Sequence, residues 1–424
     1  MKKIKFIDLF AGIGGIRKGL ELALIDAGYE PVCVFTSEIK PHAISILKQN
    51  HPNEEIAGDI TKISASSIPN FDILCAGFPC QAFSAAGKRL GFADTRGTLF
   101  FEVERIIQEK KPKGFILENV EGLVNHDNGN TLKVILAKLN DLGYKVSYRV
   151  LNAIDFGVPQ DRKRIYIVGT LLDYVSLDNF EHRYTSLENV LEKGIPTKQS
   201  KFISLLLSKF SVDELYGKSI KDKRGGDANI HSWDIGLKGD ISQEERTLLN
   251  LILKERRKKK WAEIIGIDWM DGMPLTKTQI EEFFQHKDLQ LMLDNLVNLG
   301  YLKLEHPKRL VKVDTNGITT TYREYDETKP KGYNIVTGKL SFEISKILDP
   351  KGVAPTLVAM DMNKLYVVDN NNLRKLTLRE GLRLFGYPDD YKFDISEKNG
   401  FDLLGNTVAV PVIKAISERL IKNI

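Results

Sequence analysis

The sequence predicts a doubly wound α/β fold, in which helices cover both faces of a mostly parallel sheet. The first observation is that apolar runs alternate with amphipathic segments over about the first 170 residues. The second is the first run, KIKFIDLF (3–10), which is almost continuously apolar, as expected of a parallel strand buried on both faces. The third is the glycine-rich segment AGIGG (11–15), which follows this run and precedes an amphipathic helix.

The remaining elements of this fold follow from the same patterns. Further strands are expected at 31–38, 54–60, 71–77, 114–120, 144–153 and 164–170, and helices near 16–27, 41–50, 98–110 and 130–142. Residues 172–345 show no such alternation, whereas helical patterns return at 377–388 and 405–424. The last segment carries an apolar stripe of Val408, Val412, Ile416 and Leu420, which must be buried. We therefore predict a catalytic domain formed by 1–172 and 346–424, with 173–345 inserted between its two parts.

Composition sets the broad class. Hydrophobic residues make up 42% and charged residues 28%, as in ordinary globular proteins, and no apolar run approaches the about 20 residues of a membrane span. MKKIKFIDLF is too short for a secretory signal, so we expect a cytoplasmic protein. The three cysteines, Cys33, Cys75 and Cys80, suit neither a disulfide framework nor a zinc site, and we expect no metal. The net charge of +5 permits a nucleic-acid partner without requiring one.

Polar residues gather at the predicted carboxyl ends of strands, the edge at which such sheets bind ligands. The glycine-rich turn is not of the GxGxxG type, which argues against a dinucleotide site. Glu38 could accept ribose hydroxyls and Asp59 an adenine amino group, although each acid alone could equally be a helix cap. Together these features indicate an adenosine-containing ligand.

Three further motifs lie at the same edge. In GFPCQ (77–81), Cys80 stands on a loop after a strand, which favours a nucleophile over a buried structural thiol. Glu118, in ENV (118–120), could protonate or hydrogen-bond a ring nitrogen if burial raises its pKa. In QDRKR (160–164), Gln160, Arg162 and Arg164 alternate on one strand face and suit an anionic group, with a solvated charge run as the alternative.

DLFAGIGG, GFPCQ, ENV, QDRKR and GNTV (405–408) occur in this order, and together they closely resemble the DNA cytosine-5 methyltransferases of bacterial restriction-modification systems. The resemblance covers 1–172 and 346–424. The chain departs from the family pattern at Lys40, Ala76, Phe385 and Thr407, but none of these positions carries a catalytic group.

The resemblance implies a Rossmann-like, S-adenosylmethionine-dependent methyltransferase fold with an inserted target-recognition domain. It implies that Cys80 adds to C6 of a flipped-out cytosine, whose C5 then takes the methyl group and leaves S-adenosylhomocysteine. Glu118 would contact N3 and the amino group, Arg162 would bind the base carbonyl, and Arg164 would support the site. The cofactor-binding residues that it implies are Asp8, Phe10, Gly12, Gly14, Glu38, Asp59, Leu99, Asn406 and Val408.

The expected partner is double-stranded DNA. The family uses a loop corresponding to 82–97 to close over DNA, and the contact residues expected in and beside it are Gln81, Ser84, Lys88, Arg89 and Arg96. A cognate restriction endonuclease would be a functional partner without direct contact. We expect a monomer that does not engage membranes.

The middle segment carries a signal of its own. Helical patterns at 242–261, 275–284 and 287–300 precede a hairpin at 311–324 around Asn316-Gly317, which predicts a winged-helix-like subdomain over about 242–328. The run KERRKKK (254–260) would then bring Lys258, Lys259 and Lys260 to DNA phosphates. The alternative is a small helical insert with a solvated basic face.

Three other functions remain to be weighed. A tRNA cytosine methyltransferase of the same fold is a close rival, but the large helical insertion argues against it. A catalytically idle DNA-binding protein is disfavoured by the presence of Cys80, Glu118 and Arg162. A nicotinamide-dependent dehydrogenase is disfavoured by GFPCQ and by the lack of a GxGxxG motif.

Overall fold

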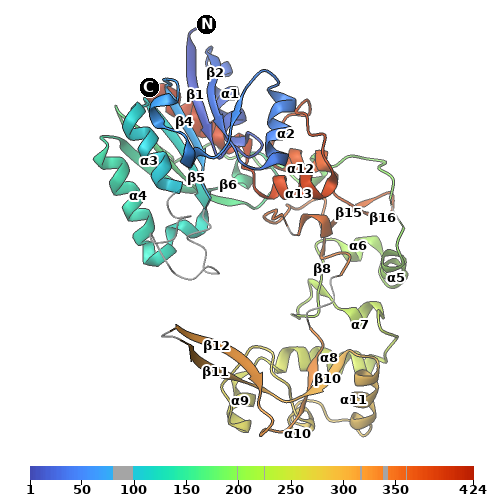
Figure 1. Cartoon of the computed structure of the whole chain (residues 1–424). Helices are drawn as coiled ribbons and strands as arrows, with labels where there is room; N and C mark the ends of the chain where they lie inside the picture. Colours follow the sequence, from blue (N-terminus) through green and yellow to red (C-terminus); the bar gives the residue numbers. More distant parts are fainter. Residues whose placement is uncertain (80–98, 198, 224, 316–317, 338–341, 360) are drawn as a thin grey trace. The chain divides into compact units, whose positions relative to one another are not determined.

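The computed structural model describes residues 1–79, 99–197, 199–223, 225–315, 318–337, 342–359 and 361–424 (Figure 1). They form two compact units. Unit 1 comprises 1–193, 349–363 and 376–424, and unit 2 comprises 194–348 and 364–375. The chain therefore passes between the units at 193/194, 348/349, 363/364 and 375/376.

Unit 1 is built on a seven-stranded sheet of order β3-β2-β1-β4-β5-β7-β6. Its strands are β1 (Lys3–Leu9), β2 (Glu30–Ser37), β3 (Ile56–Ala57), β4 (Ile73–Gly77), β5 (Gly114–Val120), β6 (Lys145–Asn152) and β7 (Lys163–Thr170). The first five pair in parallel, whereas β7 is antiparallel to both β5 and β6. This mixed sheet confirms the predicted doubly wound α/β class.

Helices cover both faces of this sheet. Neighbouring residues of β1 enter different cores, with Phe6 packing beside α1 (Gly15–Asp26) and α14 (Val410–Leu420), and Ile7 beside α3 (Leu99–Lys110) and α4 (Asn130–Asp141). The apolar stripe of α14 is buried against α1 in the first core. Gly19 permits this approach, because a Cβ atom there would lie 2.5 Å from Ile413. Unit 1 also contains α2 (Pro41–Asn50), α12 (Leu378–Leu384) and α13 (Glu397–Gly405).

Two expected elements of unit 1 differ from the structure. The strand expected at 54–60 is reduced to Ile56–Ala57, because the chain turns at Asp59 into the 3₁₀-helix η1 (Ile60–Lys62). The helix expected over 405–424 begins only at Val410, with Pro411 in its first turn, where the missing N–H is tolerated. Of the GNTV segment, Gly405 ends α13, and the other three residues lie in the connection to α14.

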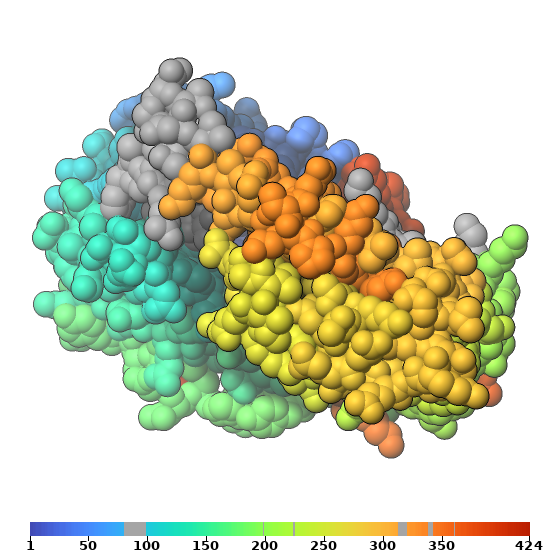
Figure 2. Space-filling view, turned by 90° about the horizontal axis from the view of Figure 1, so that it is seen from below, coloured from blue at the N-terminus to red at the C-terminus, as the bar shows by residue number. Residues whose placement is uncertain are grey.

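One part of unit 2 is a helical lobe. It contains α8 (Gln243–Glu255), α9 (Lys259–Ile265), α10 (Lys277–Glu281) and α11 (Leu289–Asn298), followed by β10 (Leu302–Glu305), β11 (Lys308–Thr315), β12 (Ile318–Tyr325) and β13 (Gly332–Ile335). Strand β10 pairs with β13, and β11 pairs with β12 as a two-stranded hairpin (orange in Figure 2), on which Leu310, Tyr322 and Tyr325 are exposed. The single helix expected over 242–261 is two helices, because the chain turns at Arg256 and Lys258 is extended.

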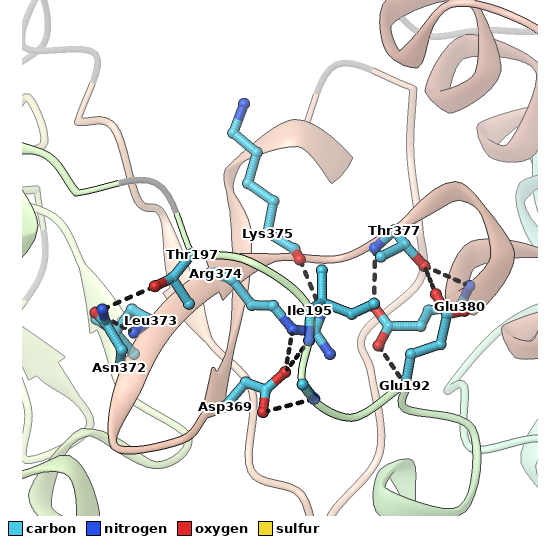
Figure 3. A network of polar contacts seen from close by, with 11 residues as sticks. Glu192, Ile195, Thr197, Asp369, Asn372, Leu373, Arg374, Lys375, Thr377 and Glu380 are labelled. Carbon is cyan, nitrogen blue, oxygen red and sulfur yellow. Dashed lines mark hydrogen bonds and ion pairs between the residues drawn. The ribbon is translucent and has the colours of Figure 1, made fainter.

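The other part of unit 2 is a five-stranded sheet of order β16-β15-β14-β8-β9. Its elements are β8 (Ser219–Ile220), β9 (Asn229–Ile230), β14 (Lys346–Ile347), β15 (Leu365–Asp369), β16 (Asn372–Lys375), α5 (Lys201–Lys209), α6 (Val212–Leu215) and α7 (Ser232–Ile235). In this unit Asp369 pairs with Arg374 at 2.9 Å and accepts hydrogen bonds from the amides of Gly194 and Ile195 (Figure 3). Among the described residues, no helix is long and apolar enough to span a bilayer.

Candidate active site

The candidate site lies at the carboxyl edge of the parallel strands of unit 1. In the strand register Asp8 is level with Cys75, and Gly77 is level with Glu118, so β1, β4 and β5 end at one edge. The antiparallel β7 begins at this edge, since Arg164 pairs with Val120 at the end of β5. The topology thus brings together motifs that lie far apart in the sequence.

The glycine-rich turn after β1 has an open backbone. Phe10, Gly12 and Gly14 all have positive φ angles, of 54°, 56° and 73°. At Gly12, apart from its chain neighbours, no atom of the described residues lies within 4 Å of the position that a Cβ would occupy, and Gly14 forms the N-cap of α1. A left-handed conformation is costly for the non-glycine Phe10, and such strain is typical of functional turns. The turn can therefore admit a ligand close to its backbone.

Glu38 joins this turn to the loop after β2. Its carboxylate accepts hydrogen bonds from the amides of Gly12 (2.6 Å), Ile39 (2.8 Å) and Lys40 (2.8 Å). The side chain is buried, and a carboxylate offers about four acceptor positions. One position therefore remains for an additional donor such as a hydroxyl group.

Asp59 caps the 3₁₀-helix η1. Its Oδ1 accepts hydrogen bonds from the amide of Thr61 at 3.1 Å and from the Thr61 hydroxyl at 2.8 Å, and these bonds lower the pKa of Asp59. Oδ2 lies 3.8 Å from the Lys62 ammonium group. The helix-cap alternative thus accounts for Oδ1, while Oδ2 has the exposed Lys62 as its one partner among the described residues.

Asp8 lies below the turn rather than at its open side. Only 1% of the residue is exposed, and neither carboxylate oxygen has a hydrogen-bond partner among the described residues. Burial raises the pKa of Asp8 to about 8, while the nearby Arg17 acts in the opposite direction. Arg17 itself is buried and pairs with Glu21 (2.7 Å) and Glu54 (2.5 Å). Arg17 was not among the predicted site residues, although its pairing with Glu21, four residues along the amphipathic helix, is a signal visible in the sequence.

Glu118 and Arg164 form an ion pair, with 3.2 Å between Oε1 and Nε. Only 12% and 13% of their side chains are exposed. Burial raises the pKa of Glu118, and Arg164 and Arg162 oppose that shift. A Cβ at Gly77 would lie 3.5 Å from Oε2 of Glu118, so this carboxyl group stands beside the beginning of GFPCQ.

Asn119 ties this strand to the GFPCQ segment. It is buried, and its Nδ2 donates to the carbonyl of Phe78 at 3.0 Å. Asn119 was not among the predicted site residues, although it is the middle residue of ENV. Beyond this point the expected residues Cys80, Gln81, Ser84, Lys88, Arg89 and Arg96 lie outside the described residues.

Arg162 has a different environment from Arg164. It is 3% exposed and donates to the carbonyls of Leu357 (3.0 Å), Gly405 (3.3 Å) and Thr407 (2.7 Å). Its guanidinium also lies 5.0 Å from the centre of the Phe385 ring. Burial lowers its pKa to about 9. The arginine that contacts Glu118 is therefore Arg164, whereas the sequence analysis gave the base contact to Arg162.

A cavity of about 400 Å³ opens beside Arg164. Its lining comprises Val120, Glu121, Gly122, Asp161, Lys163, Arg164 and Thr356. The lining is predominantly polar and charged, and it includes the end of β5 and the beginning of β7. This cavity places solvent-accessible space next to the Glu118–Arg164 pair.

The GNTV segment lies against the beginning of α1. A Cβ at Gly15 would lie 2.8 Å from both Thr407 Oγ1 and Val408 Cγ2. Val408 is buried in the core, whereas Asn406 is exposed and donates its side-chain amide to the carbonyl of Asp402. Leu99 is half-buried at the first residue of α3.

Comparisons with known proteins identify the family. The family model described as C-5 cytosine-specific DNA methylase matches residues 4–422. The chain is 64% identical over 428 residues to the Type II methyltransferase M.NlaIV of Neisseria lactamica, covering 99% of each chain. It is 42% identical to the Type II methyltransferase M.BanI of Aneurinibacillus aneurinilyticus, covering 99% of this chain and 96% of that one.

Solved structures share the fold. The Entamoeba histolytica methyltransferase EhMeth superposes with a TM-score of 0.54 at 18% identity, covering 100% of this chain and 99% of that chain. The DNMT2 protein of Spodoptera frugiperda gives 0.52 at 16% identity, covering 99% of each. With the family model spanning nearly the whole sequence, the chain belongs to the C-5 cytosine-specific DNA methylase family and is a DNA cytosine-5 methyltransferase.

Proposed function

We propose that the enzyme methylates one cytosine of a specific duplex sequence, with Cys80 as the nucleophile and S-adenosylmethionine as the methyl donor. The observation that carries this proposal is the buried Glu118–Arg164 pair beside Gly77, three residues before Cys80. A hydrogen-bonding pair beside a cysteine-bearing loop suits a planar base that must be held while a thiolate adds to it.

The residues would act on the base as follows. The Cys80 thiolate forms a bond to C6, and the electron pair displaced from the C5–C6 double bond makes C5 nucleophilic. Burial raises the pKa of Glu118 against the opposing effect of Arg164 and Arg162, and the protonated form of Glu118 would donate a hydrogen bond to N3 and stabilise charge on the ring. Arg164, being next to Glu118, is placed to donate to the base carbonyl, and Arg162 acts as a positioning residue through its three carbonyl contacts.

S-adenosylmethionine, when bound, supplies an electrophilic methyl group to C5. Loss of the C5 proton then restores the double bond and releases the Cys80 thiolate. The target base must first leave the duplex, at a cost of about a few kcal/mol. The pairing energy lost on flipping is compensated in part by the contacts of Glu118 and Arg164.

The glycine-rich edge fits an adenosine-containing cofactor. Gly12 leaves space beside the backbone, Glu38 retains an acceptor position for a ribose hydroxyl, and Asp59 Oδ2 can accept from an amino group. Phe10 is placed on the same turn. We assign Leu99, Asn406 and Val408 to the surroundings of the same ligand by family resemblance, and Asp8 to the support beneath the turn.

The biological role proposed here is protective DNA modification. The relatives M.NlaIV and M.BanI are named Type II methyltransferases, so we place this enzyme in a restriction-modification system. A cognate endonuclease would share the target sequence without contacting the enzyme, which would act as a monomer on double-stranded DNA.

The test is bisulfite sequencing of DNA from a host that expresses the enzyme. Conversion-resistant cytosines confined to one short motif are expected for the wild type, and none for Cys80→Ser, because a serine hydroxyl is a far weaker nucleophile. The purified variant should still bind S-adenosylhomocysteine in calorimetry. Methylation by Cys80→Ser at the wild-type rate would exclude the covalent mechanism, and a lack of protected cytosines in wild-type cells would contradict the DNA-modification role.

A further inference from the structure

The β11–β12 hairpin of unit 2 has two faces of different charge. Cross-strand pairs in the register alternate between the faces. What we call the cationic face carries Lys308, Leu310, Lys312, Thr321, Arg323 and Tyr325, and the opposite face carries Arg309, Val311, Tyr322 and Glu324. In the register, Asp314 follows at the next position of the cationic face, towards the turn.

The cations of the cationic face have no acidic partner in the described part of the chain. Lys312 and Arg323 are exposed, and Lys308 lies 5.0 Å from the centre of the Tyr325 ring. On the opposite face Arg309 is instead paired with Glu324, with contacts of 2.8 and 2.7 Å. Three unpaired cations on one face of an exposed ribbon indicate an anionic partner outside the chain.

The face also exposes apolar groups, since Leu310 is 47% and Tyr325 46% exposed. Within this lobe the core is formed by other elements, and it includes no residue of β11 or β12 whose side chain the structure describes. The hairpin is therefore a projecting ribbon rather than a cover for the core. Its unpaired positive charge and exposed ring are features of nucleic-acid-binding surfaces.

The two other candidates for DNA contact in this lobe are less suitable. Helix α11, which a winged helix would place in the major groove, carries Asp294 and no lysine or arginine. Of Lys258, Lys259 and Lys260, two have acidic partners: Lys258 pairs with Glu255 at 2.6 Å, and Lys260 lies 3.9 Å from Glu282. Cations that already have partners contribute less to a new ionic contact.

We infer that the cationic face of the β11–β12 hairpin binds the phosphate backbone of duplex DNA and is the main electrostatic anchor of the helical lobe. This inference rests on the proposed function in that duplex DNA is taken as the substrate. Lys308 and Lys312 are separated by about 14 Å along an extended strand, which is close to the major-groove width of about 12 Å. The two lysines can thus reach phosphates on both sides of one groove, with Arg323 between them.

The inference is tested by the salt dependence of binding to a fluorescent duplex of arbitrary sequence, followed by anisotropy over about 50 to 200 mM salt. The test variant combines Lys308→Gln, Lys312→Gln and Arg323→Gln. The matched control combines Lys277→Gln, Lys287→Gln and Arg309→Gln, which changes the net charge equally and includes the opposite face. We expect the test variant to reduce the slope of log affinity against log salt by about 2 to 3, and the control by less than about 1.

Other outcomes are equally decisive. A wild-type slope in the test variant, or an equal loss in the control, would overturn the inference, as would loss of the slope only when Lys258, Lys259 and Lys260 are replaced together. If the triple variant fails to fold in thermal melts, Lys312→Gln alone decides, with an expected slope change of about 0.9. Failure of the wild type to bind any duplex would instead contradict the proposed function. A changed methylation motif in bisulfite sequencing of the folded triple variant would show that the hairpin reads bases rather than binding phosphates.

Discussion

Two arginines two positions apart, Arg162 just before β7 and Arg164 within it, have separate tasks. Arg162 donates hydrogen bonds to three backbone carbonyls. Arg164 instead forms an ion pair with Glu118 and lines the cavity. Spacing alone could place both on one strand face, because alternate residues of a strand point the same way. Spacing could not show which arginine would bond to the carbonyls of the C-terminal segment, because these carbonyls lie about 240 positions away in the chain.

This division of labour can be measured. We expect Arg162→Gln to lower the free energy of unfolding by about 2 to 4 kcal/mol, because buried carbonyls lose their donors. Arg164→Gln should lower kcat by on the order of 100-fold with a much smaller effect on stability, since it removes a donor to the reacting base. Urea denaturation and steady-state methyl transfer on the same preparations give both quantities. The opposite ranking would return the base contact to Arg162.

Asp8 should make stability fall as pH rises. Its pKa is raised to about 8 in the folded protein, whereas an unfolded aspartate titrates near about 3.9, so between these values the folded state binds the additional proton. The free energy of unfolding then decreases with pH by up to about 1.4 kcal/mol per unit from this group.

Asp8→Asn should remove this contribution. Urea denaturation between about pH 5 and pH 8 is the measurement, with the variant becoming relatively more stable towards the alkaline end. The charged groups around position 8 are the same in both proteins, namely Arg17, Glu21, Glu38 and Glu54. The difference between the two stability curves therefore reports the titration of Asp8. Parallel curves would mean that Asp8 is ionised in the folded state.

At the scale of elements, the sequence was informative where burial is periodic. Strands β1, β4 and β5 are apolar on both faces, and α1, α3 and α4 have regular apolar stripes, so all six were predicted close to their observed bounds. The five-stranded sheet of unit 2 was missed, because β8, β9 and β14 have two residues each and come from distant segments. Such strands show no periodicity, and only tertiary contacts define them.

Caps and turn residues explain the remaining differences between expected and observed elements. Thr377 and Glu380 form a capping box at the beginning of α12, and Gly386, with a φ angle of 73°, follows its end. The expected helix over 377–388 is therefore shorter, Leu378–Leu384. Pro411 is a similar signal in the sequence, because proline is favoured in the first turn of a helix. It predicts that α14 begins near Val410 and does not extend back to Gly405.

At the scale of the whole molecule, unit 1 is assembled from segments at both ends of the sequence. Helix α14 contributes Val412, Ile413, Ile416 and Leu420 to the core that α1 and β1 share. Deletion of 410–424 would expose this apolar surface, and we expect the protein to aggregate.

The matched control for that deletion is replacement of 309–324 by a short glycine linker. The side chains of this segment that the structure describes contribute nothing to the core of the helical lobe, so the variant should remain folded. The soluble fraction after expression and the protease resistance of the purified proteins provide the comparison. A folded, monomeric enzyme without α14 would show that the first core is complete without it.

The partnership of α1 with α14 also sets the order of events on the ribosome. The two helices are separated by residues 27–409, and at about 5 to 20 residues per second the second follows the first after roughly 20 to 80 s. During that interval one side of the nascent sheet lacks the cover that α14 provides, while most of unit 2, a nearly continuous stretch of sequence, is translated. Most of unit 2 can therefore fold before the core of unit 1 is complete, although unit 1 begins earlier in the sequence. The growing chain would then depend on chaperones that bind its first strands rather than its middle segment.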